Sequence, residues 1–296
     1  MSEAQTLERA VSESPAVKRT SINRAWLKDR LDRGRTKVFT EKVKITPDLA
    51  LIMLEANTQN RGIRPAKLSQ FKSDMNSGRW QFNGETIKFA KTGELNDGQH
   101  RLQSVVETSR PQEMLVCFGL ERASRLTVDT GANRTAGDHL AVSGWPYATT
   151  MAAVARMTIG YERMDKEALG RPGDISASEV TQRVSDDPLI QEAGAYAATH
   201  SSKFKQLART SIIGFAFYQF AKLKPREAKT FIEKLRTGAD LSEESPIRLL
   251  REKLLNSPRL PVTGKVELII RAWNAWIKNA PIKQLRFTGK LPQVEG

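Results

Sequence analysis

The sequence predicts an α+β domain followed by a mainly α-helical domain. Apolar runs of strand length alternate with helical patterns up to about residue 143. From Pro146 onward helical periodicity dominates, and Pro and Gly separate the runs. A length of 296 residues allows one large domain or two. We therefore expect a flexible basic N-terminal arm at 1–40, the α+β domain at 41–143 and the helical domain at 144–296.

The N-terminal arm has two parts. Residues 1–20 are small, polar and charged, so we expect them to be disordered. Apolar residues recur at helical spacing in residues 21–40, which predicts a short basic amphipathic helix ending at Gly34. Two interpretations of this helix stay open: it packs on the protein, or it contacts DNA.

The α+β domain shows clear start and stop signals. Thr46 is a typical helix N-cap and Pro47 suits the first helical turn. Gly78 closes a helical pattern whose apolar face includes Phe71 and Met75. The expected elements, in order, are a strand at 43–45, a helix from Pro47, a loop at 57–65, a helix at 65–78, a strand or hairpin at 85–95, a helix from Gly98 to about Thr108, a strand at 113–120, a turn at 129–133 and a helix from near Thr135.

The second half is predicted to be helical almost throughout. Helices are expected at 147–163, 176–185, 187–199, 205–222, 225–237, 245–256 and 262–279, with a strand at 283–287. In the last helix Trp273 and Trp276 share one face with aliphatic residues, and basic residues interleave. Stacking on nucleic-acid bases is one interpretation, but large aromatics on one helix face favour a buried core.

Charge and composition narrow the class of protein. The net charge is +14, and most of the excess lies outside the nearly balanced segment 41–144. A basic excess of this size favours polyanionic partners, above all nucleic acid. The single cysteine, Cys117, excludes an internal disulfide and a Cys-based zinc site, and fits a reducing compartment. No apolar run approaches the length of a transmembrane helix.

One stretch combines a turn, a helix start and anion-binding residue types: GELNDGQHRLQSVVE, at 93–107. A helix N-terminus presents unpaired N–H groups and partial positive charge, and Gly98 lets a ligand approach the backbone. His100 and Arg101 add donors, so the pattern is typical of a phosphate site. A plainly capped helix start is the competing interpretation. Asp97 is then the N-cap, whereas in a ligand site it binds metal or accepts a proton.

Two further segments carry related residues. The stretch DTGANRT at 129–135 places Asp129 and Arg134 around a glycine before a helix start. It is either a satisfied turn or a second wall of the same pocket. The loop NTQNRGIRP at 57–65 offers Asn60, Arg61 and Arg64. His139 is expected at the surface or in packing and His200 at a helix end, since their spacing matches no metal site.

The order of strand, DGQHR box and helix resembles the phosphate-binding box of the ParB/sulfiredoxin superfamily. Gly98, His100 and Arg101 match the sulfiredoxin Gly-Cys-His-Arg box, and Asp97 matches the aspartate of the free serine kinases of that fold. The resemblance covers about residues 41–143. Over this range the sequence is similar to ParB-like proteins of phages, prophages and plasmids. Gln99 replaces the sulfiredoxin cysteine, which excludes sulfinic-acid repair.

The resemblance implies a small mixed sheet with helices and a nucleotide-binding, DNA-associated protein. A nucleoside triphosphate with Mg²⁺ is the expected cofactor. The residues expected to bind nucleotide or phosphate are Asn60, Arg61, Gly98, Gln99, His100, Arg101, Asp129 and Arg134. Asp97 and His100 are the expected catalytic residues, with Asp97 also a ligand of Mg²⁺. It stays open whether the protein hydrolyses the nucleotide or uses it as a conformational switch.

Two alternatives accompany this expectation. One is a phosphotransferase or nuclease of the same fold that uses Asp97 as a base. The other is a non-catalytic DNA-binding regulator. The expected partners are DNA and a nucleotide, without a membrane, and a homodimer stays open. The expected location is the cytoplasm, which is the host cytoplasm for a phage-encoded protein.

Overall fold

The computed structural model describes residues 15–58, 60, 62–127, 134–170 and 173–296. The chain divides into two compact units, Met1–Ala132 (unit 1) and Asn133–Gly296 (unit 2). Each unit has its own hydrophobic core. The division precedes the boundary expected near residue 143, because the helix that follows Thr135 packs against the next helix within unit 2.

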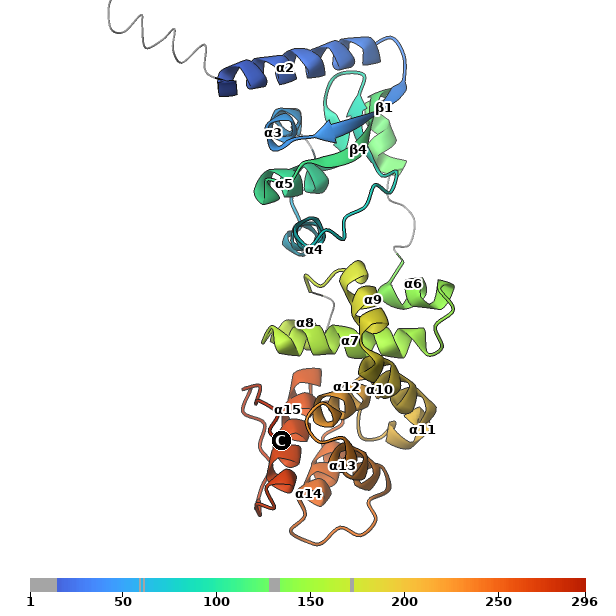
Figure 1. Cartoon of the computed structure of the whole chain (residues 1–296), viewed down its shortest axis with the longest axis vertical. Coiled ribbons are helices and arrows are strands. Elements are labelled where there is room, and N and C mark those ends of the chain that lie inside the picture. Colours follow the sequence, from blue (N-terminus) through green and yellow to red (C-terminus); the bar gives the residue numbers. More distant parts are fainter. Residues whose placement is uncertain (1–14, 59, 61, 128–133, 171–172) are drawn as a thin grey trace, which may run out of the picture. The chain divides into compact units, whose positions relative to one another are not determined.

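Unit 1 is built on a four-stranded mixed sheet in the order β1-β4-β2-β3. Figure 1 labels two of its neighbouring strands, β1 and β4. The strands are β1 (Phe39–Ile45), β2 (Thr86–Ala90), β3 (Leu95–Asp97) and β4 (Gln112–Leu120). β4 pairs antiparallel with β1 and parallel with β2, and β2 and β3 form an antiparallel hairpin. The α+β class and the small mixed sheet are confirmed.

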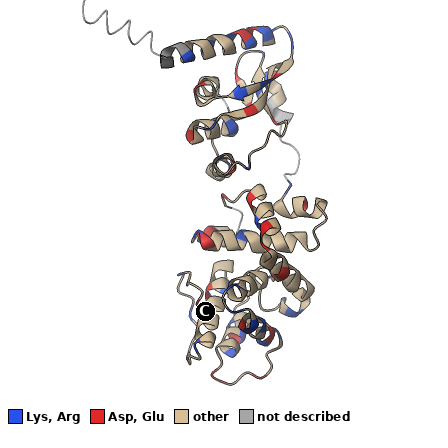
Figure 2. Ribbon diagram, viewed as in Figure 1, with Lys and Arg blue, Asp and Glu red and all other residues tan. Residues whose placement is uncertain are grey.

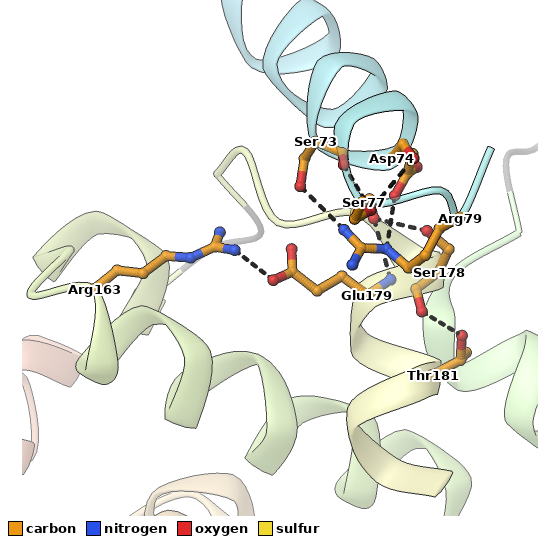
Figure 3. A network of polar contacts seen from close by, with 9 residues as sticks. Ser73, Asp74, Ser77, Arg79, Arg163, Ser178, Glu179 and Thr181 are labelled. Carbon is orange, nitrogen blue, oxygen red and sulfur yellow. Dashed lines mark hydrogen bonds and ion pairs between the residues drawn. The ribbon is translucent and has the colours of Figure 1, made fainter. Parts of the chain in front are cut away.

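The helices of unit 1 are α2 (Pro15–Gly34), α3 (Pro47–Glu55), α4 (Pro65–Asn76) and α5 (Gln99–Thr108), followed by the 3₁₀ helix η1 (Arg122–Thr127). Helices α3, α4 and α5 begin within one residue of their predicted starts, whereas α2 begins earlier and the 3₁₀ helix η1 is not among the expected elements. The Thr46 hydroxyl caps α3 by accepting from Leu49 N at 3.3 Å. After the end of α4, Arg79 donates to Asp74 Oδ1 at 3.2 Å and to Ser73 Oγ at 3.1 Å, and these contacts fix the chain reversal (Figure 3).

Helix α2 is longer than expected and packs on the sheet. It begins at Pro15, so the prediction of disorder is wrong for residues 15–20. Leu27 is buried, and the Trp26 ring meets the Phe118 ring of β4 at 6.3 Å. A Cβ on Gly34 would lie 3.1 Å from Gly119 N, so glycine lets the end of α2 approach β4 closely. Between Trp26 and Gly34 the arm is therefore a helix that packs on the sheet.

Unit 2 is helical, as predicted. Its helices are α6 (Ala136–Val142), α7 (Ala148–Glu162), α8 (Lys166–Gly170), α9 (Ala177–Asp186), α10 (Pro188–Thr199), α11 (Ser201–Phe204), α12 (Thr210–Ala221), α13 (Pro225–Thr237), α14 (Pro246–Asn256) and α15 (Val262–Ile277). The short helices α8 and α11 are not among the expected ones. The helix expected at 205–222 begins only at Thr210. Arg163 at the end of α7 pairs with Glu179 of α9 (Figure 3).

The core of unit 2 centres on α12 and α15. Trp273 of α15 is fully buried and stacks on Phe220 of α12 at 4.2 Å between ring centroids. Trp276 packs against the same core while half-buried. These contacts confirm the interpretation of the tryptophan face as core, and they leave the Trp273 ring inaccessible to nucleic-acid bases.

The strand predicted at 283–287 is absent. Residues 281–296 have no regular secondary structure, and they run along α15, held by its side chains. Leu285 is buried in the core of unit 2. The alternating pattern that suggests a strand therefore reflects one buried anchor in an irregular segment. None of the helices in the described part of the chain combines the length and apolarity needed to cross a bilayer.

Candidate functional site

The DGQHR box, residues Asp97–Arg101, lies where β3 ends and α5 begins. The N-cap of α5 is Gly98, whose φ is +109°, and no side chain caps the helix. Asp97 is the last residue of β3, and its Oδ1 accepts from Gly98 N at 2.7 Å. Asp97 is thus not the N-cap that the competing interpretation assigns to it. The box has the expected position, at the start of a helix.

Gly98 is required by the packing of unit 1. Its φ lies in the left-handed region, which residues that carry a Cβ rarely adopt. A Cβ at this position would also stand 2.4 Å from Ile87 Cδ1 on β2. The close approach that the sequence suggests at Gly98 is therefore made by the neighbouring strand.

Arg101 acts as a clamp between α5 and the sheet. Its side chain is only 9% exposed. Nη1 donates to Glu85 Oε2 at 2.8 Å, while Nη2 donates to Thr86 O at 3.0 Å and to Asp97 Oδ2 at 3.0 Å. Two carboxylates and a carbonyl thus satisfy the guanidinium, which joins the first turn of α5 to both strands of the hairpin.

The carboxylate of Asp97 is already paired with two cationic side chains. Arg101 and Lys88 both pair with its carboxylate, Lys88 Nζ at 3.6 Å. The described residues contain no group of three or more His, Cys, Asp or Glu side chains that could hold a metal ion. Mg²⁺ is usually held by one or two carboxylates together with phosphates. To bind it, Asp97 would have to release Arg101 or Lys88.

A chain of amide side chains joins the box to the loop at 57–65. Asn57 Nδ2 donates to Gln99 Oε1 at 3.0 Å. Asn60 Nδ2 donates to Asn57 Oδ1 at 2.6 Å and to Leu95 O at 2.7 Å. The loop and the helix start, which are far apart in sequence, are therefore held together by hydrogen bonds.

His100 positions the end of the same loop. The imidazole is buried, and its Nε2 accepts a hydrogen bond from Arg64 N at 2.9 Å. A ring nitrogen that accepts carries no proton, so the imidazole is neutral in this arrangement. His100 thus fixes the backbone of Arg64, the residue just before α4.

Arg64 is an exposed cation among the described residues of this loop. Its guanidinium has no hydrogen bond or ion pair to any residue that the structure describes. Its backbone is extended, with φ −91° and ψ 111°, as expected for a residue before Pro65. Arg64 belongs to the loop noted in the sequence but not to the expected binding set. The missing signal is its hydrogen bond to His100, which only the fold creates.

The other residues expected to bind nucleotide or phosphate are Arg61, Asp129 and Arg134. Arg61 and Asp129 lie outside the described residues, as does the turn expected at 129–133. Arg134 is exposed and belongs to unit 2, directly before the capping box in which Thr135 caps α6. His139 is exposed, and His200 is the C-cap of α10 and stacks on Tyr196, so both have the expected surface and helix-end positions.

Comparison with known proteins adds no assignment. No protein-family model, curated protein or solved structure matches the chain. The site is therefore defined by its own geometry: a neutral histidine and a glutamine hold the loop, and that loop presents an arginine beside the start of α5.

Proposed function

We propose that the chain is a DNA-associated protein of the ParB-like type whose unit 1 binds nucleotide phosphate beside the DGQHR box. The observation that carries the proposal is the anchoring of Arg64 by His100. An exposed guanidinium with two parallel N–H donors is suited to a phosphate group. The amide chain through Asn57 and Asn60 steadies the same loop, so less ordering is needed when a ligand binds.

In this proposal the box positions the loop, and Arg64 contacts the ligand. Gln99 and His100 hold the loop, while Gly98 and Arg101 hold the start of α5 against the sheet. The partial positive charge of the α5 N-terminus adds to the charge of Arg64. No step here requires Mg²⁺ or a base. Asp97, paired with Lys88 and Arg101, does not favour a phosphotransferase or nuclease.

The net charge of +14 supports association with DNA. Lys and Arg positions occur in both units and are interleaved with acidic positions along α2 (Figure 2). A non-catalytic DNA-binding regulator is the second candidate. It is favoured by the finding that Gly98 and Arg101 are already accounted for by packing and internal hydrogen bonds.

Isothermal titration calorimetry with CTP, ATP and GTP tests the nucleotide site. Wild type is expected to bind at least one of them, and Arg64→Ala should weaken binding about tenfold or more, because a charge-assisted hydrogen bond is lost. Arg110→Ala is the matched control. Arg110 is also exposed, follows the opposite end of α5 and has no side-chain partner among the described residues. Equal binding by the Arg64→Ala and Arg110→Ala variants would show that Arg64 is not the contact.

The salt dependence of DNA binding tests the second part of the proposal. Phosphate contacts release counterions, so DNA affinity should fall steeply as salt rises from about 50 to about 200 mM. Affinity that stays flat over this range would contradict contact with the DNA backbone. Salt-dependent DNA binding without any nucleotide binding would select the non-catalytic regulator instead.

A further inference from the structure

A pocket of about 460 Å³ lies within unit 2, between α15 and the irregular segment 281–296. This volume is in the range of pockets that hold small molecules. Its lining includes two arginines, two glutamines and three apolar residues: Arg271, Arg286, Gln284, Gln293, Ile282, Leu285 and Pro292. The pocket thus combines cationic donors with an apolar surface, and no role described above uses it.

The walls of the pocket are fixed by hydrogen bonds to a buried carboxylate. Glu267 of α15 is 2% exposed and accepts from Thr288 N at 2.9 Å, from Thr288 Oγ1 at 2.7 Å and from Gly289 N at 2.9 Å. Arg271 Nε donates to the same carboxylate at 2.9 Å. Irregular backbone held in this way is preorganised, so a ligand would not have to order it.

Side chains of α15 and α7 hold the end of the same segment. Trp273 Nε1 donates to Glu295 O at 2.7 Å, and Asn274 Oδ1 accepts from Glu295 N at 3.0 Å. The Tyr161 hydroxyl of α7 donates to Pro292 O at 2.9 Å. The segment is therefore attached on both sides of the pocket, and the pocket is a built feature of unit 2.

The two arginines differ in how far they are occupied. Arg271 uses Nε on Glu267 and Nη2 on Thr288 Oγ1. Arg286 is exposed and uses Nε on Gln284 Oε1 at 2.7 Å. Its Nη1 and Nη2 have no partner among the residues that the structure describes. The hydrogen bond from Nε to Gln284 therefore orients the Arg286 guanidinium. Nη1 and Nη2 remain able to donate to a ligand in the pocket.

We propose that this pocket binds a phosphate-bearing ligand, with the phosphate held by Arg271 and Arg286. Guanidinium groups match the oxygens of a phosphate with paired N–H donors. The apolar side chains of Ile282, Leu285 and Pro292 then contact the rest of the ligand. Glu295 also lines the pocket, but its carboxylate pairs with Lys278 and so adds little repulsion.

The phosphate has two candidate sources, a free mononucleotide or the backbone of a nucleic-acid strand. Both offer the same group to the arginines, and the apolar surface suits a base or a sugar in either case. The proposal does not rest on the function proposed for unit 1, because none of the pocket residues belongs to the DGQHR box.

Calorimetric titration of the full chain with adenosine monophosphate, inorganic phosphate and a short single-stranded oligonucleotide tests the proposal. Arg286→Ala is the informative variant, since its only described bond is to the exposed Gln284 and the fold should be preserved. We expect it to weaken binding of the monophosphate or the oligonucleotide about tenfold or more. Arg226→Ala is the charge-matched control, because Arg226 is exposed on α13 and its guanidinium has no described partner.

Each outcome decides the proposal. Binding of the monophosphate that is lost only in Arg286→Ala supports a small-molecule site, and the same loss for the oligonucleotide alone supports a strand site. Equal binding by the Arg286→Ala and Arg226→Ala variants overturns the proposal, as does the absence of binding by all three probes. Binding that is lost in Arg64→Ala but kept in Arg286→Ala also overturns it, while supporting the site in unit 1.

Discussion

At the scale of single residues, the DGQHR box divides its work between holding the fold and presenting charge. Arg101 carries the charge that the sequence suggests for a phosphate, but Glu85 and Asp97 already neutralise it. His100 acts indirectly, since its ring nitrogen fixes the backbone of Arg64. The exposed cation beside the box is thus Arg64, which lies outside the DGQHR sequence.

Gly98→Ala should destabilise unit 1 by about 1–3 kcal/mol or more, because it combines a strained φ with a clash against Ile87. Gly93→Ala is the control. Gly93 has a similar φ of +102°, but a Cβ there meets nothing within 4 Å. Urea unfolding of both variants separates the two effects. Equal destabilisation would show that backbone strain alone accounts for the glycine at position 98.

Glu267 should make the stability of unit 2 depend on pH. Burial raises the pKa of its carboxyl, but the hydrogen bonds from Thr288 and Arg271 outweigh burial and hold the pKa below its ordinary value of 4.5. Its contribution is therefore fully present above pH 4.5 and is lost as the pH falls through the lower folded pKa. Glu267→Gln should cost about 1–3 kcal/mol at neutral pH.

Urea unfolding of wild type and Glu267→Gln at a series of pH values measures this effect. The difference in free energy of unfolding between the two proteins should shrink as the pH falls below 4.5. A difference that is constant across the series would show that the charge of Glu267 does not contribute. The comparison with Gln cancels the titration of the other carboxylates, which is common to both proteins.

At the scale of elements, hydrogen bonds from helix side chains fix two segments whose sequences carry weak secondary-structure signals. The loop at 57–65 is held by Gln99 and His100, and the segment 281–296 is held by Glu267 and Trp273. Both segments border the two candidate sites. Their positions depend on side chains from helices that precede or follow them in the chain.

Thr46→Ala should destabilise unit 1 by about 1 kcal/mol, because α3 loses the side-chain acceptor for Leu49 N. Thr46→Ser keeps the hydroxyl oxygen and should recover most of this loss. Thermal unfolding followed by circular dichroism measures both variants. If Thr46→Ser is as destabilised as Thr46→Ala, the hydrogen bond of the cap is not the cause.

At the scale of the whole molecule, the chain has two separate hydrophobic cores. The core of unit 1 draws its buried residues from between Leu27 and Phe118, and that of unit 2 from between Leu140 and Leu285. A domain with its own core can in principle fold alone. The proposed nucleotide site belongs to unit 1, and the pocket between α15 and the segment 281–296 belongs to unit 2.

A fragment of residues 133–296 should therefore fold without unit 1. We expect it to keep its helical circular dichroism and to unfold cooperatively, because its core contains no residue of the other unit. Denaturant unfolding of the fragment checks this, with the full chain as reference. A broad transition without cooperativity would mean that unit 2 depends on unit 1.

The sequence by itself determined most of the elements. Periodicity, Thr46 at a cap and Gly78 at a helix end predict helices and strands correctly, because these signals act within a few residues. It also predicted that the DGQHR box lies at a helix start. It did not predict that residues 15–20 are helical. It also did not predict that 283–287 form no strand, since hydrogen bonds to α15 hold that segment.

Only the tertiary structure decided which charges are free. Arg101, Arg64 and Arg286 are alike in sequence, yet the fold buries the first among carboxylates and leaves the other two at the surface. The reason is physical: a buried guanidinium must be matched by acceptors from its surroundings, and these come from strands and loops distant in sequence. Local patterns specify elements, while long-range contacts specify which side chains remain to bind a ligand.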